Sequence, residues 1–265
     1  MFEIFAILLA FIGSTVAGIW DLFTTEVPDE VLAVMISFGI FTWYIHALTA
    51  GDFVPLFFSL TIGTFVLALG LILYKFGHWG GADAWLLAAI AYIIPIYNGG
   101  IFMFDYIFNF LIVSSAYMII YASILGIMNR GVFSYFVDDI KNNWKILAFI
   151  LVILWGSLII FVFAYRILTL PLIEVLVLIT LLVLFWRYAK VIDKRVFRKR
   201  VRTSELRVGD VLDDMIWKGI TESDIKRIRR DKKFVVIKEG IRLVPAFPIA
   251  LVVTLLFGNL MVYII

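Results

Sequence analysis

Two aspartates in a strongly apolar chain have the residue type and the placement for acid–base chemistry. Asp21 ends the first apolar stretch, and Asp83 closes the run Gly80-Gly81-Ala82-Asp83 ahead of another. Two neighbouring carboxyl groups that share a proton can activate water as a base and protonate a leaving amine as an acid. We therefore expect Asp21 and Asp83 to form a catalytic pair. Because such a pair titrates as a unit, the sequence assigns neither the base nor the acid.

Each aspartate also has an ordinary interpretation. Asp83 lies where a helix begins, so it could serve only as a helix cap, and Asp21 could be an interfacial residue that ends a helix. Gly80 and Gly81 have no side chains, which would let an extended substrate come close to the backbone there. The catalytic interpretation depends on the two aspartates together, because no other pair of acids in the sequence offers a comparable arrangement.

The composition indicates a polytopic α-helical membrane protein. Hydrophobic residues make up 63% of the 265 residues, charged residues make up 16%, and the mean hydropathy is +1.05. A soluble domain would be about half apolar and about a quarter charged. The chain has no cysteine and two histidines, which excludes disulfides, thiolate metal sites and cysteine nucleophiles. We expect neither a metal nor a cofactor.

Apolar stretches that approach the ~20 residues needed to cross a bilayer predict about eight transmembrane helices. The predicted spans are 4–20, 31–48, 53–74, 84–97 (short), 103–128, 146–165, 168–186 and 246–265. We expect four parts in the chain. They are a catalytic membrane core over 1–128, a cytoplasmic loop with two further helices over 129–186, a small basic cytoplasmic domain over 187–245 and a C-terminal transmembrane helix over 246–265.

Basic residues gather on one side of this predicted topology. When eight spans alternate, Arg166 is the one base left for the opposite side. The gathered bases are Lys75, Arg130, Lys141, Lys145 and the eighteen Lys and Arg between 187 and 242. The positive-inside rule makes that side cytoplasmic. Two predicted spans separate Asp21 from Asp83, so both aspartates should lie at the cytoplasmic face.

The stretch 187–245 predicts a small α+β unit. We expect strands at 201–206 and 211–212, a helix at 221–231 capped by Thr221, and a hairpin of 234–237 with 241–244 around Glu239-Gly240. The stretch carries 18 basic and 9 acidic residues. Anionic lipid headgroups are a sufficient explanation for this surplus beside a bilayer. Because no recognition motif accompanies the charge, we do not expect nucleic-acid binding.

Two motifs resemble those of a known protease clan. Gly80-Gly81-Ala82-Asp83 resembles the Gly-x-Gly-Asp motif of membrane aspartyl proteases, with Ala82 in place of the second glycine. Asp21 followed by Val27-Pro28-Asp29 resembles the Asp, then Ile-Pro-Asn/Asp, pattern of its prepilin peptidase branch. The motifs cover about 21–83, and the chain is similar to archaeal preflagellin (prearchaellin) peptidases and their prepilin-processing relatives. The presenilin and signal-peptide-peptidase branch, with its Tyr-Asp and Pro-Ala-Leu motifs, is the alternative; this chain has Trp20-Asp21 and no Pro-Ala-Leu.

The resemblance implies a di-aspartyl endopeptidase of the cell membrane. It would remove basic leader peptides from archaellin or type IV prepilin-like precursors at the cytoplasmic face, with Asp21 and Asp83 as catalytic residues. Its partners would be membrane lipid and a precursor with a basic leader and an apolar helix. Bacterial relatives often carry a cysteine-rich insert linked to N-methylation, so the absence of cysteine predicts cleavage without methyl transfer.

An acidic cluster follows Asp21 on a face that is otherwise basic. We expect Glu26, Asp29 and Glu30, together with Gly80 and Gly81, to bind the substrate and its basic leader. Asp138 and Asp139 could extend this rim. The alternative is that these acids are simply solvated interfacial residues. A transporter is the alternative from another functional class, but it would predict internal symmetry that the sequence does not show.

Overall fold

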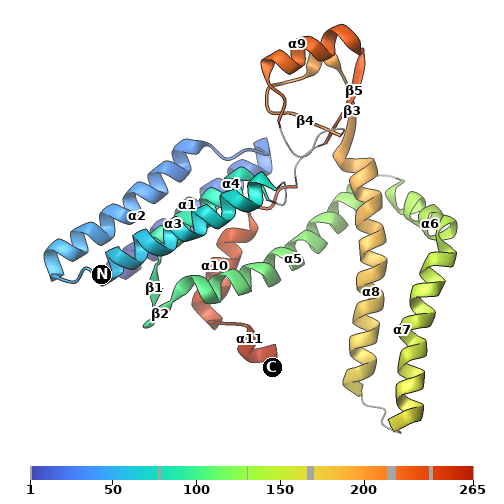
Figure 1. Cartoon of the computed structure of the whole chain (residues 1–265), viewed down its shortest axis with the longest axis horizontal. Coiled ribbons are helices and arrows are strands. Elements are labelled where there is room, and N and C mark those ends of the chain that lie inside the picture. The colour runs from blue at the N-terminus through green and yellow to red at the C-terminus, as the bar shows by residue number, and fades with distance from the viewer. Residues whose placement is uncertain are drawn as a thin grey trace. The chain divides into compact units, whose positions relative to one another are not determined.

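The computed structural model describes residues 2–76, 79–129, 131–165, 170–213, 219–238 and 241–264. The chain divides into two compact units (Figure 1). The first comprises Met1–Met118, Arg207–Ile225 and Glu239–Ile265, and the second comprises Ile119–Leu206 and Lys226–Lys238. The first unit therefore collects segments from three distant parts of the sequence.

The first unit is a bundle of apolar helices. Its elements are α1 (Phe2–Thr24), α2 (Asp29–Ala50), α3 (Val54–Lys75), α4 (Gly81–Ile93), the beginning of α5 (Phe102–Met128), α10 (Ala246–Phe257) and α11 (Met261–Ile264). A two-stranded hairpin, β1 (Ile96–Tyr97) with β2 (Gly100–Ile101), follows α4, and β4 (Val211–Leu212) also belongs to this unit.

Helix α4 is the centre of this bundle. It packs against α1, α2 and α3, and its residues from Leu86 to Ile93 are all buried. Glycines on the surrounding helices let it approach closely. A Cβ at Gly39 of α2 would lie 2.7 Å from Ile93, and a Cβ at Gly63 of α3 would overlap the ring of Tyr92. Small residues on the outer helices thus fix the position of the helix that carries Asp83.

The last carbonyl groups of α4 are hydrogen-bonded by its neighbours. The Nε1–H of Trp43 donates to the carbonyl of Ile93 at 2.9 Å, and the hydroxyl of Ser59 donates to the carbonyl of Tyr92 at 2.6 Å. The final carbonyls of a helix have no intrahelical partner, so a buried helix end needs such donors. They allow α4 to end inside the bundle.

Five described helices are long and apolar enough to cross a membrane: α1, α2, α3, α5 and α7 (Trp144–Tyr165). The protein is a helical, multi-pass membrane protein, and large apolar side chains on these helices are exposed, as lipid contact requires. The prediction of about eight spans is not supported over the described residues. Helix α4 has 13 residues and α10 has 12, so each extends roughly 20 Å, less than the ~30 Å hydrocarbon core.

Local backbone chemistry explains two of the three differences. The third difference concerns the predicted span 168–186, which corresponds to helix α8 (Leu170–Ile192), and the first two residues of that span lie outside the described ones. The predicted fourth span, 84–97, stops at Ile93 because Pro95 follows and the chain turns at Asn98 and Gly99, with φ of 50° and 78°. The predicted last span, 246–265, is interrupted at Gly258, where φ is 66°. Helices in such apolar sequence end where the backbone leaves the helical region, and hydropathy alone does not reveal this.

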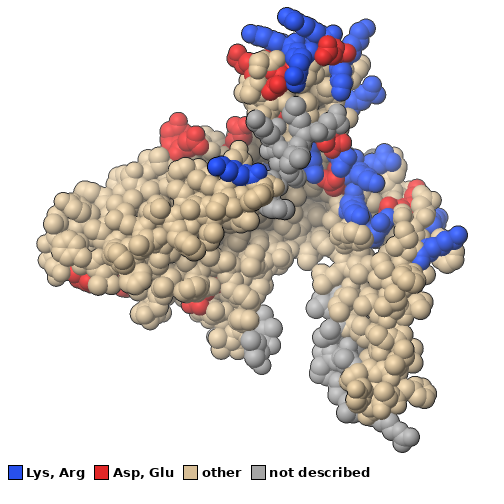
Figure 2. Space-filling view, viewed as in Figure 1, with Lys and Arg blue, Asp and Glu red and all other residues tan. Residues whose placement is uncertain are grey.

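The second unit contains two long helices and a small sheet. Its elements are the end of α5, α6 (Val132–Asn142), α7, α8 (Leu170–Ile192) continued by a π-helical turn (Asp193–Phe197), β3 (Arg198–Arg202), a 3-10 turn (Thr203–Glu205) and β5 (Phe234–Lys238). Helix α9 (Glu222–Asp231) begins in the first unit's segment and ends in the second. Arg187 of α8 pairs with Asp139 of α6 at 2.6 Å, and Lys and Arg side chains gather over β3, β5 and the adjoining part of α9 (Figure 2).

Of the elements predicted for 187–245, the helix is confirmed and the hairpin is not. Helix α9 lies within the predicted 221–231, with Thr221 and Asp224 bonded in a reciprocal capping arrangement. The predicted hairpin of 234–237 with 241–244 is wrong. Strand β5 pairs antiparallel with β3, with Arg198 opposite Lys238. Residues 243–245 instead turn directly into α10, through bonds from Ala246 N–H to Leu243 and from Phe247 N–H to Val244.

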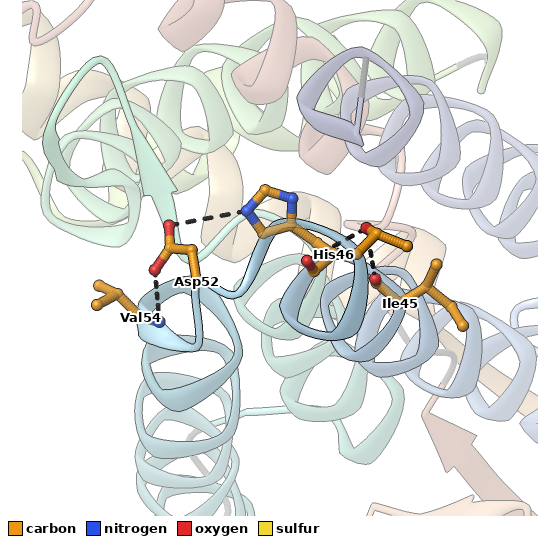
Figure 3. Close-up of polar contacts among 5 residues, drawn as sticks. Ile45, His46, Asp52 and Val54 are labelled. Atoms are coloured by element: carbon orange, nitrogen blue, oxygen red, sulfur yellow. Dashed lines mark hydrogen bonds and ion pairs between the residues drawn. The ribbon is translucent and has the colours of Figure 1, made fainter.

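A polar contact joins α2 and α3 at the end of the bundle where α1 begins. His46 Nε2 lies 3.7 Å from Asp52 Oδ2, and the other Asp52 oxygen accepts the N–H of Val54 at the start of α3 (Figure 3). The imidazole packs edge-on against Phe2 and Trp43. These contacts link three helices at the end opposite to Asp21.

Candidate functional site

Asp21 lies in the last turn of α1 and is almost completely buried, with 5% of its surface exposed. Helix α1 ends just beyond it because Thr25 adopts a positive φ of 61°. The backbone N–H of Val244 donates a hydrogen bond of 3.2 Å to Asp21 Oδ2. The guanidinium of Arg242 is also close enough to attract the Asp21 carboxylate. A segment more than 200 residues away in sequence therefore contacts this carboxylate.

Asp83 is the third residue of α4 and accepts a hydrogen bond from the N–H of Gly80, the residue that caps the helix. This is half of a capping box, in which the third helical side chain returns to the N-cap backbone. The ordinary interpretation of Asp83 as a cap therefore agrees with the structure. Capping holds the carboxylate in one place at the helix N-terminus, where the helix dipole favours negative charge.

Gly80 is required by the position of Asp83 rather than by its own backbone. Its φ of −73° and ψ of 148° are open to any residue. A Cβ at Gly80, however, would lie 2.7 Å from Asp83 Oδ2 and would displace the carboxylate. Gly81 is less constrained, since its Cβ would lie 3.5 Å from the ring of Tyr74, an ordinary contact. Ala82, which replaces the second glycine of the motif, lies within the regular helix α4 and needs no special conformation.

The two predicted catalytic aspartates are neighbours in the first unit. Asp83, from the beginning of α4, is repelled by the negative charge of Asp21, from the end of α1. Close burial of two like charges disfavours the doubly ionised pair. A pair of interacting carboxyl groups of which one carries a proton is the state required for combined base and acid catalysis.

The predicted acidic rim is exposed at the start of α2. Asp29 and Glu30 occupy its first turn, where the helix dipole stabilises acids, and Glu26 lies in the preceding loop. Acidic side chains gather at this end of α2 in the first unit (Figure 2). The backbone at Gly209 also passes here, since its Cβ would lie 3.8 Å from Glu26 Oε1. Asp139, in the second unit, is instead paired with Arg187.

Arg242 and Val244 were not among the predicted site residues. Val244 contributes a backbone N–H, which has no signature in the sequence, and Arg242 belongs to a stretch in which basic residues are frequent. Pro245, which precedes an apolar helix, is the one residue in the sequence that could have indicated a turn here. Among the described residues, no group of three or more His, Asp or Glu side chains is arranged to hold a metal ion.

The first unit of this helical membrane protein therefore holds the buried carboxyl group of Asp21 close to the half-buried carboxyl group of Asp83. Residues 8–128 match the model of the type IV leader peptidase family, and this match supports a prepilin/preflagellin peptidase-like protein. The match covers both Asp21 and Asp83 and indicates a protease that acts on pilin-like precursors. No curated protein and no solved structure matches the chain.

Proposed function

We propose that this protein is an aspartic endopeptidase that removes basic leader peptides from archaellin or type IV prepilin-like precursors. One observation carries the proposal. Asp21 and Asp83, which come from different helices within the matched region, are close enough for their charges to interact. Cleavage would take place at the cytoplasmic face of the cell membrane, without N-methylation of the product.

The two carboxyl groups would divide one proton transfer cycle between them. The ionised aspartate takes a proton from water while the water oxygen attacks the scissile carbonyl carbon. The protonated aspartate then donates its proton to the amide nitrogen as the carbon–nitrogen bond breaks. The leader carboxylate and the new amino terminus leave, and the pair again holds one proton. Because the pair titrates as a unit, we assign neither role to a single residue.

The exposed acids at the start of α2 support a basic leader as substrate. Glu26, Asp29 and Glu30 lie just after Asp21 in sequence and face solvent, so they are accessible to a cytoplasmic leader. Complementary charge increases the rate of encounter and fixes the orientation of the partner. Next to Asp83, Gly80 leaves the helix start without a side chain, which gives an extended substrate backbone access there.

The cytoplasmic location of the site is supported by the distribution of bases. Lys75 ends α3 close in sequence to Asp83, and the Lys and Arg of the second unit are concentrated in the segments that follow α8. The positive-inside rule favours the cytoplasm for such short basic connections. A precursor with a cytoplasmic basic leader would meet the aspartates on that side.

Replacing either catalytic aspartate with asparagine tests the proposal. Asp21→Asn and Asp83→Asn should each lower precursor cleavage by about a thousandfold, because an amide can neither accept nor donate the required proton. Cleavage would be followed by mass spectrometry after incubating the purified protein, in liposomes, with archaellin and pilin precursors. Asp52→Asn is the matched control, since Asp52 is half-exposed at the opposite end of the bundle. Cleavage by both active-site variants would contradict the proposal.

A further inference from the structure

Val244 and Pro245, the two residues before α10, lie against the last turns of α1. Besides the hydrogen bond from Val244 N–H to Asp21, the backbone of Pro245 crosses α1 at Gly18. A Cβ at Gly18 would lie 3.1 Å from the Cα of Pro245. Gly18 is one turn before Asp21, so the same glycine that admits this segment also brings the Val244 N–H to the carboxylate.

The segment is held in place by the packing of α10. Ala246 and Phe247 are completely buried, and α10 packs along α1. From α5, the hydroxyl of Tyr106 donates to the carbonyl of Phe247 at 3.1 Å, and the ring of Phe110 lies 4.4 Å from that of Phe247. A donor fixed in this way is already oriented before substrate binds, which is how protein dipoles assist catalysis most effectively.

Arg242 lies two residues before Val244, whose N–H binds Asp21, and so belongs to the same segment beside this carboxylate. Among the described residues, the charged groups that act on Asp21 are Asp83 of α4, which repels it, and Arg242, which attracts it. On α2, Asp29 and Glu30 are directed to solvent. Arg242 therefore offsets the repulsion that two buried carboxylates would otherwise experience.

We propose that Arg242 and the backbone N–H of Val244 form a positioning element that orients the Asp21 carboxylate for catalysis. This proposal rests on the proposed function and adds to it residues from outside the matched region 8–128. In this view the segment before α10 completes the active site. Its N–H holds Asp21 Oδ2 in place, and its cation attracts the carboxylate as a whole.

Two substitutions at position 242 test the role of the charge. Arg242→Gln should lower kcat for precursor cleavage on the order of tenfold, with KM nearly unchanged, because a misplaced catalytic group affects the chemical step. Arg242→Lys should recover most of the loss, since it restores a cation. Lys75→Gln is the matched control, because it removes one exposed positive charge elsewhere in the first unit and should leave kcat unchanged.

A substitution at Gly18 tests the N–H of Val244. Gly18→Ala places a methyl group against Pro245 and should move the Val244 N–H away from Asp21, lowering kcat several-fold with little change in KM. Gly156→Ala is its control, because a Cβ at Gly156 of α7 meets no atom within 4 Å. Wild-type kcat in both Arg242→Gln and Gly18→Ala would overturn the proposal.

A measurement without substrate separates this proposal from the proposed function. Carbodiimide labelling of Asp21, followed by mass spectrometry at one fixed pH, reports the protonated carboxyl group. Arg242→Gln should increase the labelling of Asp21, because removal of a nearby cation favours the protonated form of the carboxyl group. Lys75→Gln, the control, should leave the labelling unchanged. If Asp21→Asn still cleaves precursors, the proposed function fails, and the labelling still decides whether Arg242 acts on Asp21. Equal labelling in wild type and Arg242→Gln would overturn the role of Arg242.

Discussion

A buried polar side chain lies at each end of α10, and the two side chains differ in the number of hydrogen bonds that they form. At the beginning, Asp21 accepts one hydrogen bond, from the N–H of Val244. At the far end, Asn109 of α5 is completely buried and uses both ends of its amide. Its Nδ2 donates to Thr254 Oγ1 at 3.0 Å and to the carbonyl of Gly258 at 2.6 Å, and its Oδ1 accepts the N–H of Leu260 at 3.0 Å.

In the described part of the chain, the difference separates a polar group whose hydrogen-bonding capacity is used from one whose capacity is mostly free. Asn109 forms hydrogen bonds with the Gly258 carbonyl and the Leu260 N–H, which have no helical partner where α10 ends. These bonds stabilise a helix end inside an apolar bundle. Asp21 is equally inaccessible, yet among the described residues Val244 is the one hydrogen-bond donor to its side chain. A buried carboxylate with remaining acceptor capacity is costly for stability and available for chemistry.

The largest expected effect on stability is at the far end of α10, where Asn109 forms its hydrogen bonds. Asn109→Leu should lower the free energy of unfolding by about 1–3 kcal/mol, because the Gly258 carbonyl and the Leu260 N–H would be left buried without partners. The melting temperature in detergent measures this, and the control is Asn129→Leu, at an exposed position after α5. The kcat of the folded fraction should stay at the wild-type value. A reduced kcat with unchanged stability would show that the two ends of α10 do not differ in the way described.

A pair of glycine substitutions sharpens the comparison at the catalytic end. Gly80→Ala should reduce kcat on the order of tenfold, because its Cβ displaces Asp83 Oδ2, whereas Gly81→Ala should have an effect within about twofold. Both substitutions add one methyl group at adjacent positions, so their difference isolates the geometry of Asp83. Equal kcat values for the two variants would mean that the Asp83 carboxylate does not depend on Gly80.

The smallest expected effect is on substrate encounter. Asp29→Lys and Glu30→Lys should each raise KM for a basic-leader precursor a few-fold, with little change in kcat, and added salt should reduce the difference because these acids are exposed. Glu3→Lys makes the same charge change at the other end of the bundle and should leave KM unchanged. A KM that is insensitive to both rim substitutions and to salt would identify the acids as solvated interfacial residues.

The sequence predicted the parts of the fold that hydrophobic pattern controls. Helices α1, α2, α3, α5 and α7 lie close to the predicted spans, because a long uncharged stretch has few other ways to cross a bilayer. The ends of α4 and α10 were missed because they depend on proline, on positive φ and on buried hydrogen bonds rather than on hydropathy. The pairing of β5 with β3 was missed because the residue types Glu239-Gly240 are typical of a local hairpin in the sequence.

The site was predictable in its residue types more than in its surroundings. Motif and spacing selected Asp21 and Asp83, and the structure brings them together, while their catalytic role stays a prediction. The contribution of Val244 could not be predicted, since a backbone donor can come from any residue. Arg242 could not be distinguished from its many basic neighbours without the turn that orients it. Tertiary contacts over long sequence distances decide such features.

The contact between Gly18 and Pro245 has a consequence for how this protein can change in evolution. Positions 18 and 245 are far apart in the chain, yet the space beside one is occupied by the backbone at the other. In any descendant that keeps the contact, a larger residue at position 18 would have to be accompanied by a shift of the segment before α10. Helix α1 and the C-terminal segment are therefore expected to accept substitutions together, as one inherited unit.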